Sequence, residues 1–335
     1  LSSGTWSQVK KFTATDGDAN DQFGSVVHIS DKFVVNGASW YEGVGTNSGS
    51  VYISNILPIL PLDPYANEIQ LLSDDPQNSD QFGNSLSSSN DYVIVASNLD
   101  DTGVYANHGT IFVYKTYNKG VSFTQIAKFA PLNGSGLNIP HIQFGYDCSI
   151  SGDIIVASAT SADSSKGRVY IYYTTDSGTT WTVSSNVLQP SDLSAGDRFG
   201  ESVAISGNYI VVGCSTQNTS TGSAYVFVTS DSGATWTQQA KLTASDGATA
   251  DYFGFSCGIY QTSTTDIDIV IGAYKDDDTA SASGSAYVFN GNGSSWSQTA
   301  KLVHDSPSAA DYFGYSVGIY SNHIIVGSKW DDAPL

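Results

Sequence analysis

The sequence is poor in several residue types that common classes of protein require. It has no Met, three Cys, and 13 Lys and Arg residues against 32 Asp and Glu residues, which gives a formal net charge of −19. An acidic surface repels the phosphate backbone, so we expect no nucleic-acid partner. No apolar run approaches the ~20 residues that cross a bilayer, so we expect no membrane span in this chain.

The acidity is almost entirely Asp, because only three of the acidic residues are Glu. Asp favours turns and caps whereas Glu favours helices, so the negative charge is expected in loops. The chain also has 33 Gly and 20 Tyr residues. Apolar runs separated by Ser, Thr, Asn and Asp are typical of short β-strands joined by turns.

A Phe-Gly pair recurs along the whole chain at intervals of 54 to 62 residues. The six phenylalanines are Phe23, Phe82, Phe144, Phe199, Phe253 and Phe313. An Asp stands two positions before five of them, at Asp21, Asp80, Asp197, Asp251 and Asp311. A period of this size indicates a solenoid, a propeller or an array.

Each repeat contains four candidate strands, which we call A to D. Residues 199–205, 209–213, 284–289 and 296–302 typify strands A, B, C and D. They are β-branched or aromatic runs bounded by Gly, Asn, Asp and Ser, and no helical periodicity competes with them. Four antiparallel strands in ~57 residues form a propeller blade. The sequence therefore predicts an all-β fold, a single β-propeller domain over residues 1–335, with strand A innermost.

The strand count bears on how the ring closes. We find six A, six B and five C strands, and six D strands if residues 6–12 are included. We expect this N-terminal strand to close the ring by completing the last blade. Residues 327–332 match 272–277, so the chain stops in a loop before its expected C strand. Two explanations fit: the molecule continues, which allows a seventh blade, or another chain donates the missing strand. The count is compatible with six or seven blades.

The three cysteines do not indicate a disulfide framework. Cys148 and Cys257 lie four residues after the Phe of their repeats, where the others have Val or Leu, and Cys214 replaces an Ala. We expect all three to be small apolar core residues.

Two turns between strands C and D have the pattern Thr-x-Asp-x-Gly-x-Thr-Trp, starting at Thr174 and Thr229. They resemble the Asp-box of sialidases and related propellers. Asp accepts bonds from turn amides, Gly takes a positive φ, and Trp packs against the blade, so a structural role is expected. The sialidase reaction of that family needs three arginines, and this chain has only Arg168 and Arg198.

The wider repeat resembles the FG-GAP family, to which the propeller of integrin α-chains belongs. The Phe-Gly pair, a following Gly-Ala and a Gly-Ser-Ala-Tyr-Val-Phe strand recur in order over nearly the whole chain. The resemblance implies an extracellular adhesion or recognition propeller, often loaded with calcium. The family's Gly-Ala-Pro proline is absent, and the A–B hairpins are too short for integrin-type calcium loops, with only a hint at Asp266 and Asp268.

Acidic residues gather instead in the D–A loops. Asp16, Asp18, Asn20 and Asp21 place oxygens in the first of these loops at a spacing that suits calcium, which makes them the candidate metal ligands. An Asp before a strand also commonly caps a turn, and this reading remains open. Ca²⁺ is thus a possible cofactor, and no other is indicated.

The D–A and B–C loops should share one face of the ring. Trp40 and Trp330 stand at matching B–C positions, and a closed six-bladed ring would bring them together beside Tyr41 and Asp331. Exposed Trp with carboxylates suits a sugar or a partner protein, so these four are the candidate ligand-binding residues. Each Trp could instead cover its own blade loop.

Three sequons, at Asn133, Asn218 and Asn292, fall in predicted loops and are candidate glycosylation sites. We therefore expect a secreted or cell-surface propeller that is not an enzyme. It would act in binding, adhesion or structural assembly, with a protein or glycan of the cell surface or matrix, or with itself. The alternatives are a lectin-like carbohydrate binder and, less favoured, a glycoside hydrolase or lyase.

Overall fold

The structure is a computed structural model that describes residues 11–30, 32–43, 45–56, 68–101, 106–131 and 141–331. The strands of the first three sheets are β1 (Val26–Ile29), β2 (Phe33–Ala38), β3 (Ser50–Asn55), β4 (Glu68–Leu71), β5 (Leu86–Ser89), β6 (Tyr92–Ser97), β7 (Thr110–Lys115), β8 (Thr124–Phe129), β9 (Phe144–Ser151), β10 (Ile154–Ala159), β11 (Arg168–Tyr173) and β12 (Thr182–Val183). The remaining strands are β13 (Val203–Ser206), β14 (Tyr209–Cys214), β15 (Ser223–Val228), β16 (Thr237–Leu242), β17 (Phe253–Ser263), β18 (Asp266–Ala273), β19 (Ser285–Gly291), β20 (Trp296–Leu302), β21 (Phe313–Tyr320) and β22 (His323–Ser328). Two single helical turns, α1 (Ala162–Ser165) and α2 (Gln217–Ser220), lie in B–C loops.

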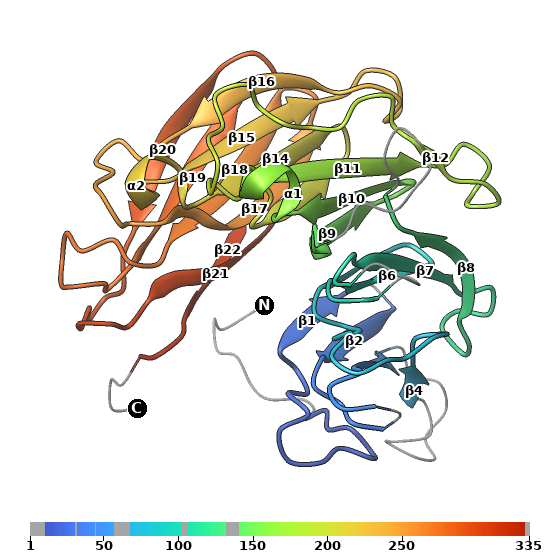
Figure 1. Cartoon of the computed structure of the whole chain (residues 1–335). Coiled ribbons are helices and arrows are strands. Elements are labelled where there is room, and N and C mark those ends of the chain that lie inside the picture. The colour runs from blue at the N-terminus through green and yellow to red at the C-terminus, as the bar shows by residue number, and fades with distance from the viewer. Residues whose placement is uncertain are drawn as a thin grey trace, which may run out of the picture.

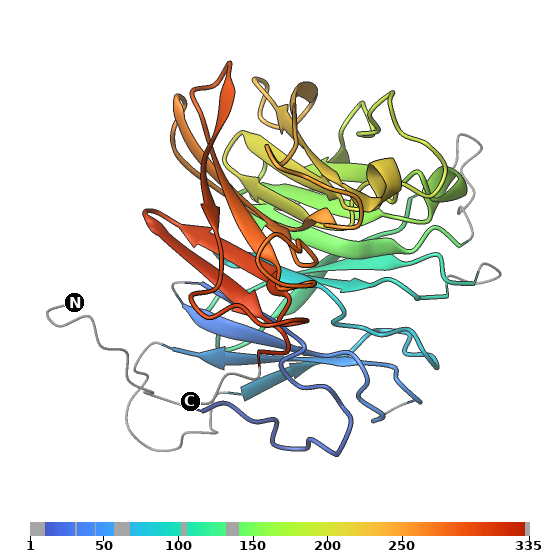
Figure 2. The same cartoon turned by 90° about the vertical axis from the view of Figure 1, so that its left-hand side faces the viewer.

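Each sequence repeat forms one antiparallel sheet, a blade, whose strands pair in chain order. Blades 1 to 5 have four strands each, and blade 6 consists of β21 and β22 within the described residues. The blades follow one another around the molecule from β1 to β22 (Figure 1), and Figure 2 gives a side view of the same order. The predicted all-β propeller is confirmed. The predicted closing strand, residues 6–12, lies almost entirely outside the described residues.

Strand A of each blade lies at the ring axis, as predicted from its small residues. A hollow of about 330 Å³ is lined by residues of β5, β9, β13, β17 and β21 together with His28 of β1. Because all six blades border this one space, they are arranged around a common axis and not in a straight stack.

The blades are held together by apolar side chains that pack between neighbours. Each of four buried core clusters combines residues of two successive blades, from blades 1 and 2 to blades 4 and 5. Every residue of β2, β6, β10 and β14 is buried, as the continuous apolar runs of strand B predict. Blade 6 is more open: Ile325 is 74% exposed, whereas Val270 at the same position of blade 5 is fully buried.

The Phe-Gly pair joins each blade to the one before it. The Phe N–H donates to a carbonyl of the preceding B–C loop at 2.8 to 3.2 Å in five repeats, for example from Phe253 to Thr221. The following Gly has φ between 81° and 96° in all six repeats. A Cβ on Gly254 would stand 2.4 Å from the carbonyl oxygen of Ser223, so a side chain is excluded by space as well as by φ. The predicted core role of the Phe holds fully for Phe82, Phe144, Phe199 and Phe253, which are 0% exposed.

The Asp two positions before the Phe caps a turn. In all five repeats that have it, one carboxylate oxygen accepts the backbone N–H three residues earlier, at 2.5 to 2.7 Å. All five carboxylates lie in buried residues. This position is therefore part of the scaffold, as the turn-capping interpretation predicted.

The Asp-box turns are structural. The hydroxyl of Thr174 donates to Asp176 and accepts the N–H of Gly178, and Asp176 also accepts the N–H of Thr180. These bonds lower the pKa of Asp176 to about 2. The second turn repeats the pattern, and its Trp236 is 5% exposed in the core between blades 3 and 4.

The cysteines are confirmed as buried core residues. Cys148, Cys214 and Cys257 are all free thiols. Burial raises the pKa of each thiol, so all three stay protonated at neutral pH.

Candidate functional site

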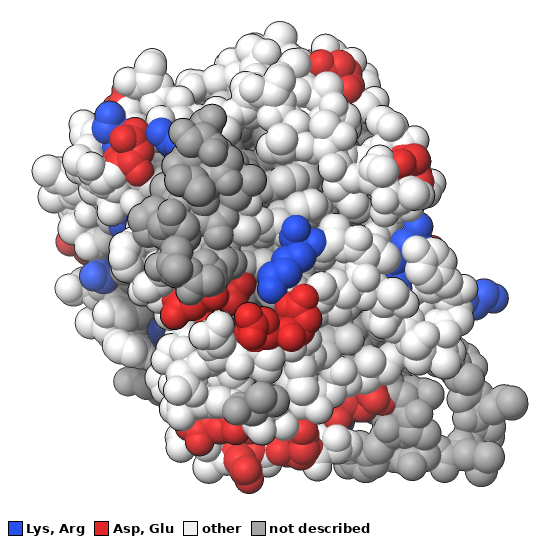
Figure 3. All heavy atoms as spheres, turned by 45° about the vertical axis from the view of Figure 1, so that its right-hand side comes forward, with Lys and Arg blue, Asp and Glu red and all other residues white. Residues whose placement is uncertain are grey.

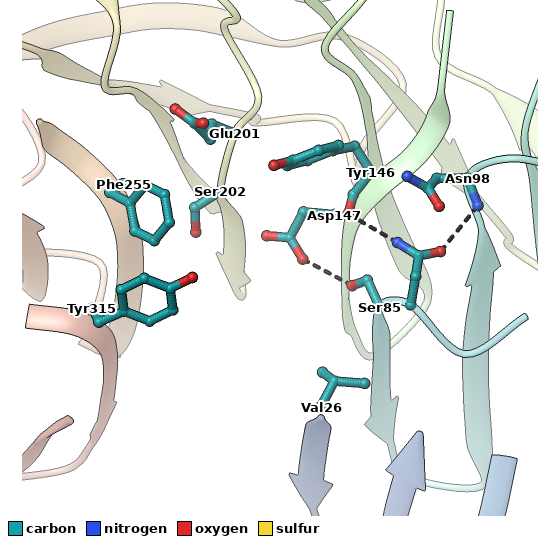
Figure 4. Close-up of a pocket in the computed structure, with 10 residues that line it drawn as sticks. Val26, Ser85, Asn98, Tyr146, Asp147, Glu201, Ser202, Phe255 and Tyr315 are labelled. Carbon is teal, nitrogen blue, oxygen red and sulfur yellow. Dashed lines mark hydrogen bonds between the residues drawn. The ribbon is translucent and has the colours of Figure 1, made fainter. Parts of the chain in front are cut away.

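A second hollow opens at the end of the axis where the D–A and B–C loops meet. Its volume is about 390 Å³, and residues from all six blades line it. Figure 4 shows Glu201, Ser202, Phe255 and Tyr315 facing Tyr146, Asp147 and Asn98 across this space. We call it the axial hollow.

The residue directly after each Phe-Gly pair supplies much of the lining. In repeats 2 to 6 these residues are Asn84, Tyr146, Glu201, Phe255 and Tyr315. The pair itself is invariant among the repeats, whereas the next residue is an amide in repeat 2, an acid in repeat 4 and aromatic in repeats 3, 5 and 6. The fold thus fixes the position of this side chain, while its type varies between repeats.

Asp147 is the acidic group between the two hollows, since it lines both. Its carboxylate accepts the hydroxyl of Ser85 and the N–H of Val203, both at 2.8 Å, so it connects blade 3 to blades 2 and 4. Burial raises the pKa of Asp147, and these hydrogen bonds oppose that shift. Sister repeats have Ser or Val here, so the carboxylate is particular to blade 3.

Glu201 is the second acid of the axial hollow. It bonds to the hydroxyl of Ser215 and lies 3.8 Å from Arg198, whose guanidinium is 5.3 Å from the ring centre of Tyr146. The side chain of Glu201 is only 10% exposed. Both acids of the hollow are therefore held by protein donors.

Six aromatic side chains run from the axial hollow to the rim over blades 5 and 6. Successive ring centres are 4.4 to 5.5 Å apart along this aromatic strip. Its members are Tyr252, Phe255, Tyr274, Tyr312, Tyr315 and Trp330. The first five are half-buried and Trp330 is 60% exposed. The strip is thus a partly exposed apolar surface that leads into the hollow.

The strip is absent from the matching positions of blades 2 to 4. There, only Tyr146 is aromatic; the other residues are Gln81, Asn84, Asn98, Leu99, Gln143, Thr160, Ser161, Arg198, Glu201, Ser215 and Thr216. The propeller forms without aromatic groups at these positions. Their presence in blades 5 and 6 therefore requires an explanation other than folding.

Two lysines lie over the strip. The Lys329 ammonium is 4.1 Å from the ring centre of Tyr315 and donates to its hydroxyl at 3.0 Å. Lys275 is 4.7 Å from the ring centre of Tyr252. Burial raises the pKa of Tyr274 to about 12.

The predicted ligand-binding residues Trp40 and Trp330 lie in equivalent loops but contact different neighbours. The N–H of Trp40 donates to the carbonyl of Asp21 and that of Trp330 to the carbonyl of Asp311, so the two loops match as predicted. Trp40 is 42% exposed and borders a hollow of about 300 Å³ with Asn20 and Asp21. Trp330 instead packs on Tyr312 in the strip. The contacts described for the two tryptophans are thus with different neighbours.

Tyr41 and the predicted calcium ligands form a hydrogen-bonded group. Asp16 accepts the hydroxyls of Tyr52 at 2.7 Å and Tyr41 at 3.0 Å, and Gln70 at 3.0 Å. Asp21 caps the N–H of Asp18. Oxygens of Asp16, Asp18 and Asp21 do not all lie within 4.8 Å of one another. The carboxylate of Asp16 is thus held by protein donors, and calcium binding by this group stays a prediction.

Asp331 lies 3.5 Å from His304, which comes from the preceding D–A loop. Sequence spacing gave no reason to connect this histidine with any acid, because 27 residues separate the two. The aromatic strip was also missed, although comparing the repeats position by position would have revealed it. Of the sequons, Asn133 lies outside the described residues, and Asn218 and Asn292 are exposed in loops.

Charge on the surface is divided into small groups. In the view of Figure 3, acidic side chains form separate patches, and a basic side chain lies directly beside one of them. Lys128, Lys241 and Lys301 illustrate this, since each pairs with an Asp of a D–A loop at 2.6 to 2.8 Å. Among the described residues no helix is long and apolar enough to span a bilayer.

The family comparison covers more than half of the chain. A model of the FG-GAP repeat matches residues 6–54, 65–114, 182–227, 236–289 and 296–334. These segments contain five of the six Phe-Gly pairs, all but that of Phe144. No curated protein matches the chain significantly.

Solved structures resemble the fold at low sequence identity. A putative 6-phosphogluconolactonase from Bacteroides uniformis aligns at a TM-score of 0.50 with 11% identity, covering 83% of this chain and 69% of its own. Saccharomyces cerevisiae Sqt1 aligns at a TM-score of 0.39 with 8% identity, covering 67% of this chain. The chain spans about half, 48%, of the length of that Sqt1 chain. At such identities, similarity concerns the fold alone.

Proposed function

Since the chain belongs to the FG-GAP repeat family, we propose that it is a non-catalytic binding module that acts outside the cell in adhesion or structural assembly. The proposed binding surface is the loop face that carries the axial hollow and the aromatic strip. Its partner would be a protein or a glycan of the cell surface or matrix.

The aromatic strip is the observation that supports this proposal best. Half-buried aromatic rings lose little side-chain entropy on binding and offer large apolar area, which makes them frequent centres of protein interfaces. Here six of them are in contact and end at an exposed Trp330. A partner that covers the strip would bury this area without rearranging the blades.

A glycan is the second candidate, favoured by the polar lining of the axial hollow. The side-chain amide of Asn98 and the hydroxyls of Tyr146 and Ser202 line the hollow together with the rings of Phe255 and Tyr315. Sugars present apolar ring faces together with hydroxyls, so they match a surface of aromatic rings bordered by hydrogen-bonding groups. A lectin-like propeller would use both features at once.

Catalysis is the weaker alternative. The Bacteroides uniformis structure is named a putative lactonase, but this likeness extends only to the fold. Asp147 and Glu201, the two acids of the axial hollow, each accept hydrogen bonds from protein groups. Neither carboxylate is therefore positioned to accept a proton from a substrate.

The test is a binding screen of the protein against a glycan array and a panel of matrix proteins. We expect specific binding that falls at least about tenfold in the double variant Tyr312→Gln, Trp330→Leu, which installs the residues of blade 2. Trp40→Leu is the matched control, because it removes a Trp from the same loop position outside the strip. Repeating the screen with EGTA measures calcium dependence.

Binding that survives the double variant but is lost in Trp40→Leu would move the site to blade 1. Incubation of each bound glycan with the protein, followed by mass spectrometry, tests catalysis. Cleavage of any of them would overturn the non-catalytic assignment.

A further inference from the structure

His304, Asp311 and Asp331 meet at the loop end of blade 6, which we call the blade 6 corner. One potential ligand atom of each lies within 4.8 Å of the other two. The Nε2 atom of His304 is 3.5 Å from Asp331 and 3.6 Å from Asp305. The D–A loop supplies His304 and Asp311, and the B–C loop supplies Asp331.

Asp311 adds an independent observation at this corner. It is 1% exposed, and its Oδ2 atom accepts the N–H of Ser308 at 2.6 Å. Its Oδ1 atom is buried and has no hydrogen-bond partner among the described residues. A buried carboxylate oxygen without a donor costs free energy, which a bound cation would recover.

In blade 5 a cation of the protein itself lies among carboxylates of the same two kinds of loop. There the Lys301 ammonium lies 2.8 Å from Asp246, 3.0 Å from Asp276 and 2.6 Å from Asp278. Asp276 occupies the position of Asp331 in its repeat. In blade 6 the nitrogen described beside Asp331 is the imidazole of His304 from the D–A loop, which can bind a metal ion where the ammonium of Lys301 cannot.

We propose that the blade 6 corner binds a divalent transition metal ion of the zinc type through His304, Asp311 and Asp331. One imidazole and two carboxylates are a ligand set that Zn²⁺ accepts, whereas Ca²⁺ prefers oxygen ligands alone. Tetrahedral ligands at ~2.0–2.1 Å from zinc stand about 3.3 Å apart. The present 3.5 Å between His304 and Asp331 is close to that spacing.

Proton positions allow this binding without a charged histidine. The Nδ1 atom of His304 accepts the N–H of Ser306 at 3.3 Å, so the neutral ring carries its proton on Nε2. The metal ion takes the place of that proton, which moves to Nδ1 as the ring gives up the long contact to Ser306. No net proton is released by the histidine.

The metal ion would add a side-chain link between two loops that the Trp330 N–H already joins through the carbonyl of Asp311. Asp331 follows Trp330 directly, so the ion would fix the B–C loop that carries this exposed ring of the aromatic strip. The expected consequence is a metal-dependent change in Trp330 fluorescence.

The experiment is calorimetric titration of the full 335-residue protein with ZnCl₂ after removal of metals with EDTA. We expect one saturable site, and at least about tenfold weaker binding in His304→Ala. His323→Ala is the matched control, since it removes an exposed histidine of the same blade. Asp278→Asn tests the corner occupied by Lys301 and should leave zinc affinity unchanged.

Two results would overturn the proposal: no zinc binding to the stripped protein, or equal affinity in the wild type and His304→Ala. Circular dichroism establishes that the variants fold. If His304→Ala does not fold, the zinc-dependent fluorescence of the wild type is compared with that of Trp330→Leu. Quenching that is lost in Trp330→Leu would place the bound zinc beside Trp330. Quenching that persists in Trp330→Leu would then count against the site.

Discussion

Blades 2 to 4 and blades 5 and 6 present the same loop positions with opposite chemistry. Around Phe199 the flanking residues are Arg198 and Glu201, whereas around Phe253 they are Tyr252 and Phe255. Both phenylalanines are fully buried and both donate their N–H to the preceding loop. The comparison separates residues that stabilise the ring from loop residues whose type the ring does not determine.

The largest loss of stability is expected from removing the buried Phe of a Phe-Gly pair, a residue that all six repeats share. Phe253→Ala removes a 0% exposed ring between blades 4 and 5 and should lower the free energy of unfolding by about 3–5 kcal/mol. Phe255→Asn, two residues away, installs the residue of blade 2 and should cost less than about 1.5 kcal/mol. Denaturant unfolding of both variants measures the contrast. Equal losses would mean that the strip is also part of the scaffold.

The lysine pairs allow a comparison of blade 5 with blade 4. Lys301 binds three carboxylates and Lys241 binds one, Asp192. Burial alone would lower the pKa of Lys301, but the three Asp side chains raise it overall. We expect Lys301→Met to cost about 2 kcal/mol and Lys241→Met about 1 kcal/mol or less. Thermal unfolding at low and high salt measures both, and a reversed order would contradict this account.

The capping Asp of blade 2 should make stability depend on pH. Burial, with Asp100 and Asp101 nearby, raises the pKa of Asp80 to about 6. The native protein therefore keeps this proton between pH ~4 and 6 while the unfolded chain, at ~3.9, releases it. Stability should fall by about 1–2 kcal/mol as pH rises through this range.

Asp80→Asn should flatten that part of the stability profile, because its side chain carries no titrating proton. Asp100→Asn is the informative control: it removes a neighbouring negative charge and should shift the fall in stability to lower pH. Urea unfolding from pH 4 to 7 measures all three proteins. An unchanged profile in Asp80→Asn would assign the pH dependence to another group.

The smallest effect is expected at the lysine over the strip. Lys329→Met removes the contact to Tyr315 and should change the free energy of unfolding by about 0.5–1 kcal/mol. Lys115→Met, which removes a similar contact to Tyr92, is the control on another blade. If the strip is the binding surface, only Lys329→Met should alter affinity for a ligand found in the screen. An equal change in both variants would remove the distinction between the two regions.

Most of the scaffold could be predicted from the sequence because its signals are local. The capping Asp21 and its equivalents and the Asp-box at Asp176 act within a few residues of their own position. The Phe-Gly pair acts between blades, but its regular recurrence makes it visible in the sequence. Strand alternation and turn chemistry likewise extend over single elements. The order of strands within each blade could therefore be predicted from the sequence alone.

The sites were less predictable because they combine residues that are distant in the sequence, from separate strands or separate blades. The spacing around Asp16 predicted calcium ligands, and its hydrogen-bond partners Tyr52 and Gln70 come from the outer strands of blade 1. No pattern of spacing in the sequence predicts these contacts. The same is true of the strip, where Phe255 of blade 5 contacts Tyr315 of blade 6.

The sequence by itself determined that this protein is a ring of antiparallel blades with acidic loops, since periodicity and turn residues are properties of short segments. Only the tertiary structure decided that His304 lies beside Asp331 and that six rings form one strip. The reason is geometric: loops from separate blades converge at one end of the axis, and packing between blades sets their distances.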